Sequence, residues 1–436
     1  MHIHFWNQLS AIEQQNLLER PKASQPDSIR EKTQAIIDQV REEGDAALID
    51  LTVLHDKVKL TQLTTTLAEF SAAKNQIRKE ALAAIERAQQ QITTYHQAQQ
   101  PEIRKIETAP GIYCERQPRA IDRVGLYVPG GSAPLISTLL MLAIPAQLAG
   151  CSLKVLCTPP NKNGTIDPHL LYAAELCGIQ QIFKIGGAQA VAAMAYGTES
   201  VPKVDKIFGP GNAFVLAAKM LVSQDAKGAS IDMPAGPSEL LVIADDNANA
   251  DFVAADLLSQ AEHGIDSQVI LLTMSVDFAN QVHGALNQQL SQLSRRTIAE
   301  QSLAHGRIIV VTSLEQAFSI SNRYAPEHLS LQITHPENFL TEIHNAGAVF
   351  LGDWSAETMG DYITGSNHVL PTSGFARAYS GLSLVDFMKF ISFQKVSRPG
   401  LQALGPFAEQ LAELEGLDAH RNAVSIRLGV DFHPEH

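Results

Sequence analysis

The stretch Glu239–Thr273, ELLVIADDNANADFVAADLLSQAEHGIDSQVILLT, contains a strand, a helix and a second strand in one run of sequence. Its two ends, ELLVIA and QVILLT, are continuous apolar runs, which is typical of strands buried on both faces of a parallel sheet. Residues 251–264 between them have helical spacing, and Gly264 is placed to end this helix in the left-handed conformation. A unit of this kind predicts a parallel sheet covered by helices.

The same alternation continues on both sides of this unit. Downstream, three apolar runs alternate with helical patterns: RIIVVT (307–312), HLSLQI (328–333) and AVFLG (348–352). Upstream, an independent series has four such runs: VGLYVP (124–129), LKVLCT (153–158), IFKIGG (182–187) and VDKIFG (204–209). Two separate series predict two doubly wound α/β domains in one chain.

The two ends of the chain lack this rhythm. Residues 10–20, 28–43 and 71–99 have helical patterns. From about Leu382 the alternation is lost again, and one amphipathic pattern covers residues 406–414. We therefore expect small helical segments at the N- and C-termini of the α/β protein.

The composition excludes several classes of partner. The chain has 436 residues, of which 45% are hydrophobic and 18% charged, and its formal net charge is −13. It contains no long run of lysine or arginine. An acidic chain of this kind is not expected to bind nucleic acid or an anionic membrane.

The cysteines and the apolar segments predict a location. Four cysteines without a CxxC pair indicate a reducing compartment and no disulfides. The N-terminus, MHIHFWNQLS, lacks the pattern of a signal peptide. The most hydrophobic segment, residues 133–151, includes Pro145 and Gln147 and is too short and too polar to cross a bilayer. We expect a cytoplasmic protein.

Three strand-to-helix turns are rich in glycine: PGGS (129–132), GGAQ (186–189) and GPGN (209–212). Glycine allows the backbone to approach a phosphate, and the following helix presents free N–H groups. None of the turns has the GxGxxG spacing, and tight turns also need glycine for structural reasons alone. Two interpretations stay open. The turns either form a nucleotide site or only connect the sheet to its helices. If they form a nucleotide site, we expect Tyr127, Gln189 and Asn212 to line its crevice.

The helix of residues 251–264 ends in polar groups. Gln260 and His263 continue the stripe formed by Val253 and Leu257. The pair is either a hydrogen-bonded helix end or half of a metal site, because side chains three residues apart can bind one ion.

A second polar pair, Glu327-His328, follows Pro326, which disfavours helix and indicates a turn just before a strand. Glu and His together can transfer protons near neutral pH, although a surface ion pair is an equally good interpretation of the pair alone. Further along, Asp361 and His368 lie in a polar, glycine-bearing loop that suggests a ligand-binding edge.

At this point the motifs together resemble those of histidinol dehydrogenase, in the order typical of the family and over nearly the whole chain. They are VGLYVPGGSAPL, GGAQA, VDKIFGPGNAFV, IDMPAGPSE, LLSQAEHG, YAPEHL, FLGDWS, GDY-x-x-G-x-NHVLPT and a late Glu415…His420 pair. The last pair carries no signal by itself. The resemblance implies oxidation of L-histidinol through L-histidinal to L-histidine, with two NAD⁺ reduced at one site and one Zn²⁺ bound per site.

The resemblance also implies roles for residues. The zinc ligands match Gln260, His263, Asp361 and His420, a set of nitrogen and oxygen donors that suits zinc. The proton-transfer residues match Glu327 and His328. The NAD contacts match Tyr127, Gln189 and Asn212. The substrate contacts match Ser238, Gln260, His263, His328, Asp361, His368, Glu415 and His420.

The chemistry suggests how the proton-transfer pair divides its work. Neutral His328 suits removal of the alcohol proton as hydride leaves, and Glu327 is the better group to activate water for the second oxidation. A thiol route through Cys114 or Cys151 is a less favoured alternative, because Cys151 opens an apolar strand and Cys114 lies outside both strand–helix series.

The domain organisation implied by the resemblance has two incomplete Rossmann-like domains in a homodimer. We expect an N-terminal helical segment (1–23), a first α/β domain with the metal and acid–base residues (24–126 and 239–381) and a second α/β domain on the NAD side (127–238). A C-terminal segment (382–436) is expected to cross to the partner subunit. The alternatives are a zinc-dependent hydrolase without NAD, using Glu327 as base, and a non-catalytic protein that binds imidazoles or amines.

Overall fold

We describe the fold from a computed structural model of the chain, which covers residues 1–20, 26–130 and 134–429. The chain divides into two compact units, each described by itself. Unit 1 contains Met1–Gln99 and Ile121–Phe387, and unit 2 contains Gln100–Ala120 and Met388–His436. Within the described ranges, no helix combines the length and apolar content that a membrane crossing requires.

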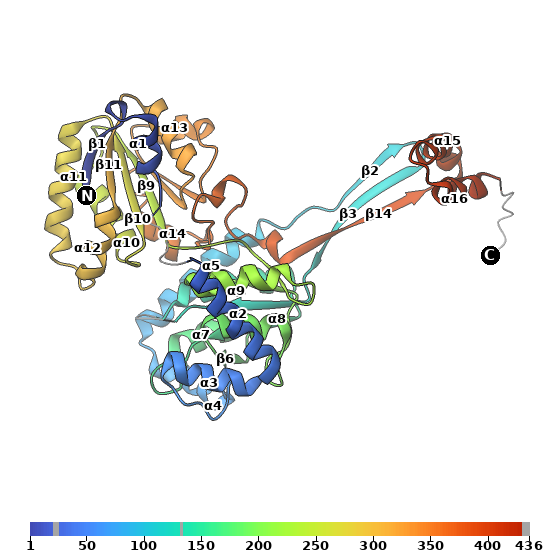
Figure 1. Cartoon of the computed structure of the whole chain (residues 1–436), viewed down its shortest axis with the longest axis horizontal. Coiled ribbons are helices and arrows are strands. Elements are labelled where there is room, and N and C mark those ends of the chain that lie inside the picture. Colours follow the sequence, from blue (N-terminus) through green and yellow to red (C-terminus); the bar gives the residue numbers. More distant parts are fainter. Residues whose placement is uncertain (21–25, 131–133, 430–436) are drawn as a thin grey trace. The chain divides into compact units, whose positions relative to one another are not determined.

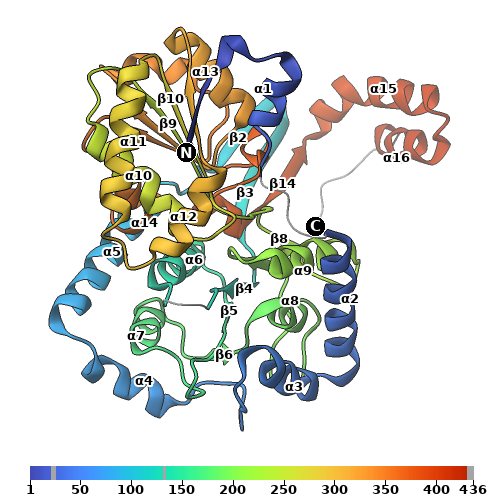
Figure 2. The same cartoon turned by 60° about the vertical axis from the view of Figure 1, so that its left-hand side comes forward.

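Unit 1 contains a six-stranded parallel sheet, which we call the six-stranded lobe together with its helices (Figures 1 and 2). Its strands, in spatial order, are β1 (His2–Phe5), β11 (Arg307–Val310), β10 (Gln268–Thr273), β9 (Glu239–Ala244), β12 (His328–Gln332) and β13 (Ala348–Leu351). The strand–helix–strand unit that opened the sequence analysis forms its centre, so the prediction of a parallel α/β fold is confirmed.

The helices cover both faces of this sheet because successive strand residues point to opposite sides. Leu240 and Val242 of β9 pack with α10 (Ala250–Ala261), α11 (Val276–Leu290) and α12 (Arg296–His305). Leu241 and Ile243 pack on the other side with α1 (Ala11–Leu17) and α13 (Leu314–Tyr324). Helix α10 ends at Ala261, and Gly264 does not have a positive φ, so the predicted left-handed glycine cap is wrong.

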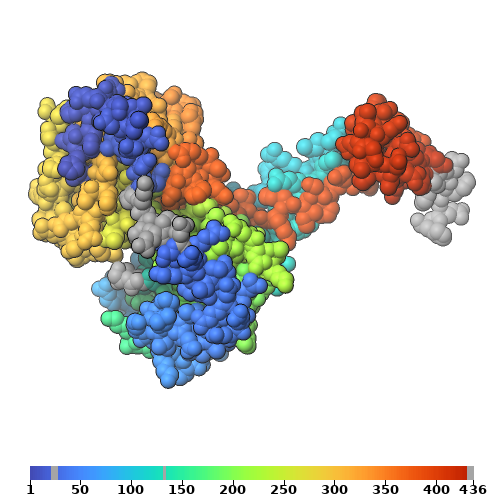
Figure 3. Space-filling model, in the orientation of Figure 1, coloured from blue at the N-terminus to red at the C-terminus, as the bar shows by residue number. Residues whose placement is uncertain are grey.

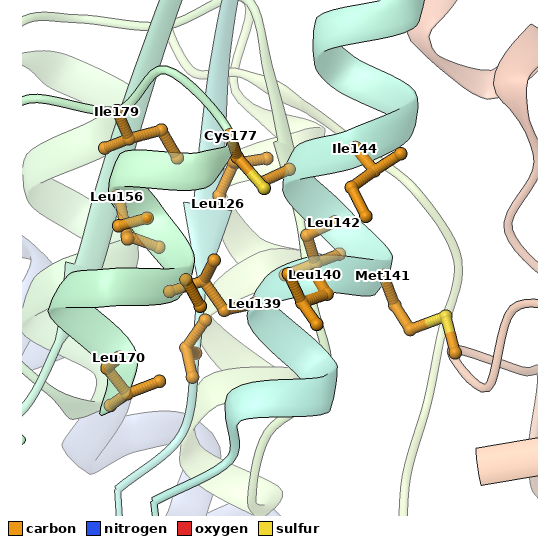
Figure 4. Close-up of a cluster of buried hydrophobic side chains, with 14 of the residues drawn as sticks. Leu126, Leu139, Leu140, Met141, Leu142, Ile144, Leu156, Leu170, Cys177 and Ile179 are labelled. Atoms are coloured by element: carbon orange, nitrogen blue, oxygen red, sulfur yellow. The ribbon is translucent and has the colours of Figure 1, made fainter. Parts of the chain in front are cut away.

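Unit 1 also contains a five-stranded parallel sheet, the five-stranded lobe. Its strands, in spatial order, are β6 (Ile182–Lys184), β5 (Leu153–Thr158), β4 (Arg123–Tyr127), β7 (Lys206–Phe208) and β8 (Ser230–Ile231). Helices α6 (Ile136–Ala149) and α7 (Pro168–Leu176) pack on one face, and α8 (Gly187–Tyr196) and α9 (Ala213–Gln224) on the other. Figure 4 shows leucines of α6 gathered beside Leu126 and Leu156 of the sheet.

Residues 26–97 differ from the expected domain division, which joined 24–126 to 239–381. Four helices lie in this range: α2 (Pro26–Glu43), α3 (Asp45–Asp56), α4 (Leu67–Ala73) and α5 (Lys79–Gln97). Ile37 of α2 and Leu48 of α3 are buried with α8 and α9, and Ile92 of α5 is buried with α6. These helices therefore pack against the helices that cover the five-stranded sheet.

The N-terminal segment also differs from a purely helical one. Residues His2–Phe5 form β1, which pairs in parallel with β11 at the edge of the six-stranded sheet. Figure 3 shows the dark-blue N-terminal residues against the yellow and orange surface of this lobe. Among the described residues of this segment, α1, which Ser10 caps, and the short 3-10 helix Trp6–Gln8 fit the helical expectation.

Unit 2 is a three-stranded antiparallel sheet followed by two helices. The strands are β2 (Arg104–Ala109), β3 (Ile112–Ala120) and β14 (Met388–Val396). The helices are α15 (Arg398–Leu414) and α16 (Asp418–Leu428), which pack against each other. The sequence analysis missed this sheet, since its strands mix polar and apolar residues without the continuous apolar runs of the parallel strands.

Candidate active site

The predicted acid–base pair lies at the amino edge of the six-stranded sheet. His328 is the first residue of β12, and Glu239 is the first residue of the neighbouring β9. Helix α10 runs back across the sheet, so Gln260 in its last turn returns to this same edge. The strand–helix–strand connection thus brings residues far apart in sequence to one place.

The backbone of Glu239 holds both members of the pair. Its N–H donates to Glu327 Oε2 at 2.8 Å, and its carbonyl oxygen lies 3.1 Å from His328 Nδ1. Since a carbonyl only accepts hydrogen bonds, Nδ1 carries the ring proton and Nε2 is left with a free lone pair. Nε2 faces Asp361, whose Oδ1 is 3.8 Å away.

Burial sets the charge of both groups. It lowers the pKa of His328 to about 4, against the opposing effect of the Asp361 carboxylate. Burial also raises the pKa of Glu327 well above its usual value, and the nearby carboxylates of Glu239, Asp361 and Glu357 act in the same direction. Both shifts favour the neutral form, so the imidazole is available as a base at neutral pH.

A second acidic residue, Glu357, was missed by the sequence analysis. It begins α14 (Glu357–Tyr362) and precedes Asp361 by four residues, which places both carboxylates on one face of the helix. This spacing was the signal available in the sequence. Ser259 Oγ donates to Glu357 Oε2 at 3.0 Å, and Glu357 Oε1 is 3.8 Å from His328 Nδ1.

These side chains can hold a divalent cation. One ligand atom from each of His328, Glu357 and Asp361 lies within 4.8 Å of the others. Burial raises the pKa of Glu357, and the Asp361 carboxylate raises it further. The donor set of imidazole nitrogen and carboxylate oxygen fits zinc.

Gln260 and His263, the predicted ligands on α10, border the same group. The Gln260 amide lies against Glu357, and with its nitrogen toward that carboxylate its oxygen accepts from the Glu239 N–H at 3.0 Å. Burial lowers the pKa of His263, and the Asp361 carboxylate opposes this effect. A neutral imidazole of this kind is a suitable metal ligand.

The remaining predicted residues are distributed between the lobes and units. His368 Nδ1 lies 2.8 Å from the Asp361 carbonyl oxygen, and its Nε2 lies 3.1 Å from Thr138 Oγ1 on α6 of the five-stranded lobe. Ser238 immediately precedes β9. Glu415 caps the C-terminus of α15 and His420 lies on α16, so both belong to unit 2 and are described only within it.

A separate pocket of about 730 Å³ lies in the five-stranded lobe, and its lining includes Tyr127, Gln189 and Asn212. Tyr127 ends β4, and its hydroxyl accepts from the Gly187 N–H at 3.0 Å. Asn212 caps α9 by accepting from Phe214 N at 3.1 Å. The three residues predicted at the glycine turns therefore meet in one cavity at the carboxyl edge of this sheet, where α/β folds bind nucleotides.

The glycine turns bordering this pocket are shaped by close backbone contact. Gly209 has φ +123°, and a Cβ placed on it would lie 2.1 Å from the Tyr127 carbonyl oxygen. Only glycine fits this position. Glycine is thus structurally required in the turn that leads to Asn212, which lines the pocket.

Parallel sheets, a buried acid–base pair and a nearby group of metal-binding donors define an α/β enzyme. The sequence pattern of the histidinol dehydrogenase family matches residues 18–428. The chain belongs to the histidinol dehydrogenase family. It is therefore an oxidoreductase of histidine biosynthesis that acts in the oxidation of histidinol.

Individual relatives agree with this assignment over their full length. Histidinol dehydrogenase of Vibrio vulnificus (strain CMCP6) is 54% identical over 423 residues, which cover 97% of each chain. That of Xanthomonas oryzae pv. oryzae (strain KACC10331 / KXO85) is 53% identical over 430 residues, covering 99% of this chain and 100% of the relative. The crystal structure of histidinol dehydrogenase from Elizabethkingia anophelis superposes with a TM-score of 0.94 at 49% identity and covers 98% of this chain and 97% of its own.

Proposed function

We propose that the chain carries out the NAD-dependent, four-electron oxidation of L-histidinol to L-histidine through L-histidinal. The observation that carries this proposal is the buried Glu327–His328 pair, held by the backbone of Glu239 beside Asp361 in a member of this family. Zinc, when bound by Gln260, His263, Asp361 and His420, would supply a template and a Lewis acid for the alcohol. NAD, bound at Tyr127, Gln189 and Asn212, would accept the hydride.

His328 acts first in the proposed sequence. Its Nδ1–H donates to the Glu239 carbonyl oxygen, so Nε2 is the atom that takes the hydroxyl proton as hydride leaves the carbon. The lowered pKa keeps the imidazole neutral and ready to accept that proton. The same hydrogen bond fixes the ring in one orientation.

Glu327 acts in the second oxidation, which requires water. A raised pKa makes the ionised carboxylate a stronger base than an exposed glutamate, and Glu327 must lose its own proton before it can activate water. The Glu239 N–H donates to Glu327 Oε2 at 2.8 Å, which leaves Glu327 Oε1 for the reacting groups.

We further propose a homodimer in which α15 and α16 dock on the partner subunit. Phe407, Leu411 and Leu414 of α15 are 67%, 62% and 75% exposed, an apolar face larger than isolated surface residues would give. In this arrangement Glu415 and His420 complete the partner's site. The four free cysteines support the proposal of a reducing, cytoplasmic location.

The test is the absorbance of reduced nicotinamide after L-histidinol is added to the zinc-loaded protein with NAD. We expect two reduced cofactors for each histidinol consumed. A yield of one reduced cofactor per histidinol would limit the activity to the first oxidation. Binding of histidinol without any turnover would identify a non-catalytic binding protein. A zinc-dependent hydrolase without NAD is not favoured, because the family is one of oxidoreductases.

A further inference from the structure

The turn that precedes the Glu327–His328 pair has an unusual backbone. Ala325, which ends α13, has φ 55° and ψ 70°, in the left-handed region that residues with a Cβ rarely occupy. Such conformations persist only where surrounding contacts hold them, and they concentrate at functional sites. The Ala325 N–H donates to the Ser321 carbonyl oxygen at 2.7 Å, but this bond holds only the helix side of the turn.

Arg20, at the end of the N-terminal segment, holds the other side. Its Nη2 donates to the carbonyl oxygens of Tyr324 at 3.0 Å and Ala325 at 3.4 Å. Its guanidinium carbon also lies 4.0 Å from the centre of the Tyr324 ring. One side chain thus contacts both residues of the turn that leads into the acid–base pair.

The same guanidinium forms a two-bond ion pair with Glu239. Arg20 Nε lies 2.5 Å from Glu239 Oε1, and Nη2 lies 2.9 Å from Oε2. The Glu239 carboxylate is buried and also accepts from the Ser373 N–H at 2.8 Å. Glu239 therefore has its side chain fixed by Arg20 while its main chain holds Glu327 and His328.

We propose that Arg20 is a positioning residue for the Glu327–His328 pair. It fixes the pair from two sides, through the Ala325 turn that delivers the pair and through Glu239 that orients both side chains. Arg20 touches neither reacting side chain in the contacts described, so its effect is transmitted by backbone geometry. The inference rests on the proposed proton-transfer roles of the pair.

The geometry of the contacts explains why arginine is needed. A guanidinium presents several donors in a rigid plane, so it can bind a carboxylate with two bonds and still donate to two carbonyl oxygens. Lysine has a single charged nitrogen and can satisfy only part of this set. Without Arg20, the buried Glu239 carboxylate loses its cation, and the first residue of β9 is free to shift.

The experiment compares Arg20→Met and Arg20→Lys with the wild-type, zinc-loaded protein. We expect Arg20→Met to lower kcat by about 10- to 100-fold, the scale of a misplacement near 1 Å, with KM for histidinol within about threefold. Bound zinc should stay at the wild-type level, and Arg20→Lys should recover part of kcat. The matched control is Arg296→Met on α12, which removes the exposed Arg296–Glu300 ion pair and should leave kcat unchanged.

Chemical rescue separates positioning from general stability. Millimolar guanidinium should raise kcat of Arg20→Ala several-fold and leave the wild-type rate unchanged, since the free ion can occupy the vacated site. A rise in melting temperature without a gain in rate would show that Arg20 only stabilises the fold and would overturn the proposal. An equally active Arg20→Met variant would also overturn it, whereas an inactive wild-type protein would refute the proposed function itself.

Discussion

The protonation state and orientation of single residues in this site depend on the atoms that surround them. His328 has a fixed tautomer because its Nδ1 faces a carbonyl oxygen, and it is neutral because it is buried. Glu327 and Glu357 have raised pKa values because they too are buried, and the Asp361 carboxylate raises both further. These contacts support predictions about the metal, the acid–base pair and the dependence of stability on pH.

The first prediction concerns the metal. We expect His263→Ala and Asp361→Ala to lose bound zinc and nearly all turnover while the protein stays folded, because both residues lie at element ends rather than in the core. Metal analysis and far-UV circular dichroism measure the two properties. The control is His305→Ala, an exposed histidine at the end of α12. A zinc-free variant with normal histidinol oxidation would refute the ligand assignment.

The second prediction separates the two acid–base residues. Glu327→Gln should slow oxidation of histidinal far more than the first hydride transfer, since only the second oxidation needs activated water. Single-turnover measurements of each half-reaction test this, and a general base is typically worth about 10²–10⁴-fold. Equal losses in both half-reactions would contradict the division of work, though not the importance of the pair.

The third prediction concerns stability and pH. The pKa of His328 falls from 6.5 to about 4 in the folded protein. Between these values the unfolded chain binds more protons, so this residue makes the free energy of unfolding rise with pH, by at most about 1.4 kcal/mol per unit. The contribution is complete above pH 6.5 and is lost as the pH falls toward 4.

The test of this prediction is a comparison of slopes in the metal-free protein. Glu327 has a raised pKa and therefore acts with the opposite sign, making the folded state less stable as pH rises above 4.5. The slope of His328→Gln should accordingly be lower than that of the wild type between pH 4 and 6.5. Parallel curves for the two proteins would exclude a buried neutral imidazole.

Among the elements, the turn from β7 to α9 is held by a buried ion pair and by hydrogen bonds with both of its partners. Lys219 on α9 and Asp232, just past β8, are 2% and 1% exposed and form an ion pair of 2.5 Å. Lys219 Nζ donates to the Gly209 carbonyl oxygen at 2.7 Å, and the Gly209 N–H donates to Asp232 Oδ2 at 2.8 Å. Lys219 and Asp232 thus hold the turn that leads to Asn212, which lines the pocket.

The fourth prediction follows from this ion pair. Lys219→Met leaves the Asp232 charge buried and unpaired, which should destabilise the protein by about 3–5 kcal/mol. It should also raise KM for NAD with little change in KM for histidinol, because the turn borders only the pocket of the five-stranded lobe. Chemical denaturation and initial-rate kinetics measure these effects. The double variant Lys219→Met/Asp232→Asn should recover stability, and a failure to do so would argue against the charge as the cause.

At the scale of the whole molecule, the question is which subunit supplies His420. We expect His263→Ala and His420→Ala to be inactive as separate homodimers. In a mixed dimer with a shared site, one site carries both defects and the other carries neither. Random pairing makes half of the dimers mixed, so about a quarter of all sites should be intact in a closed two-fold assembly. Activity and zinc near that fraction would support the exchange, and an inactive mixture with proven heterodimers would place His420 in its own subunit's site.

Much of the parallel architecture could be predicted from the sequence. Buried parallel strands are continuous apolar runs, and all nine predicted runs became strands, from β4 at Arg123–Tyr127 to β13 at Ala348–Leu351. The antiparallel strands β3 and β14 were missed because neither contains a fully buried residue and each mixes polar with apolar residues. The packing of residues 26–97 on the five-stranded sheet was also missed, since an amphipathic stripe does not specify which surface it covers.

The sequence by itself determined the residue types of the site and, through its motifs, the family. The pairs Gln260/His263 and Glu327-His328 are local patterns, readable from spacing and turn chemistry. Only the tertiary structure shows that the Glu239 backbone contacts Glu327 and His328, that Glu357 lies near His328 and that Arg20 contacts the turn before them. Arg20 and Glu239 are 219 positions apart, and such contacts leave no periodic signal in the sequence. Burial depends on the same long-range packing, so the neutral state of His328 also belongs to the structure.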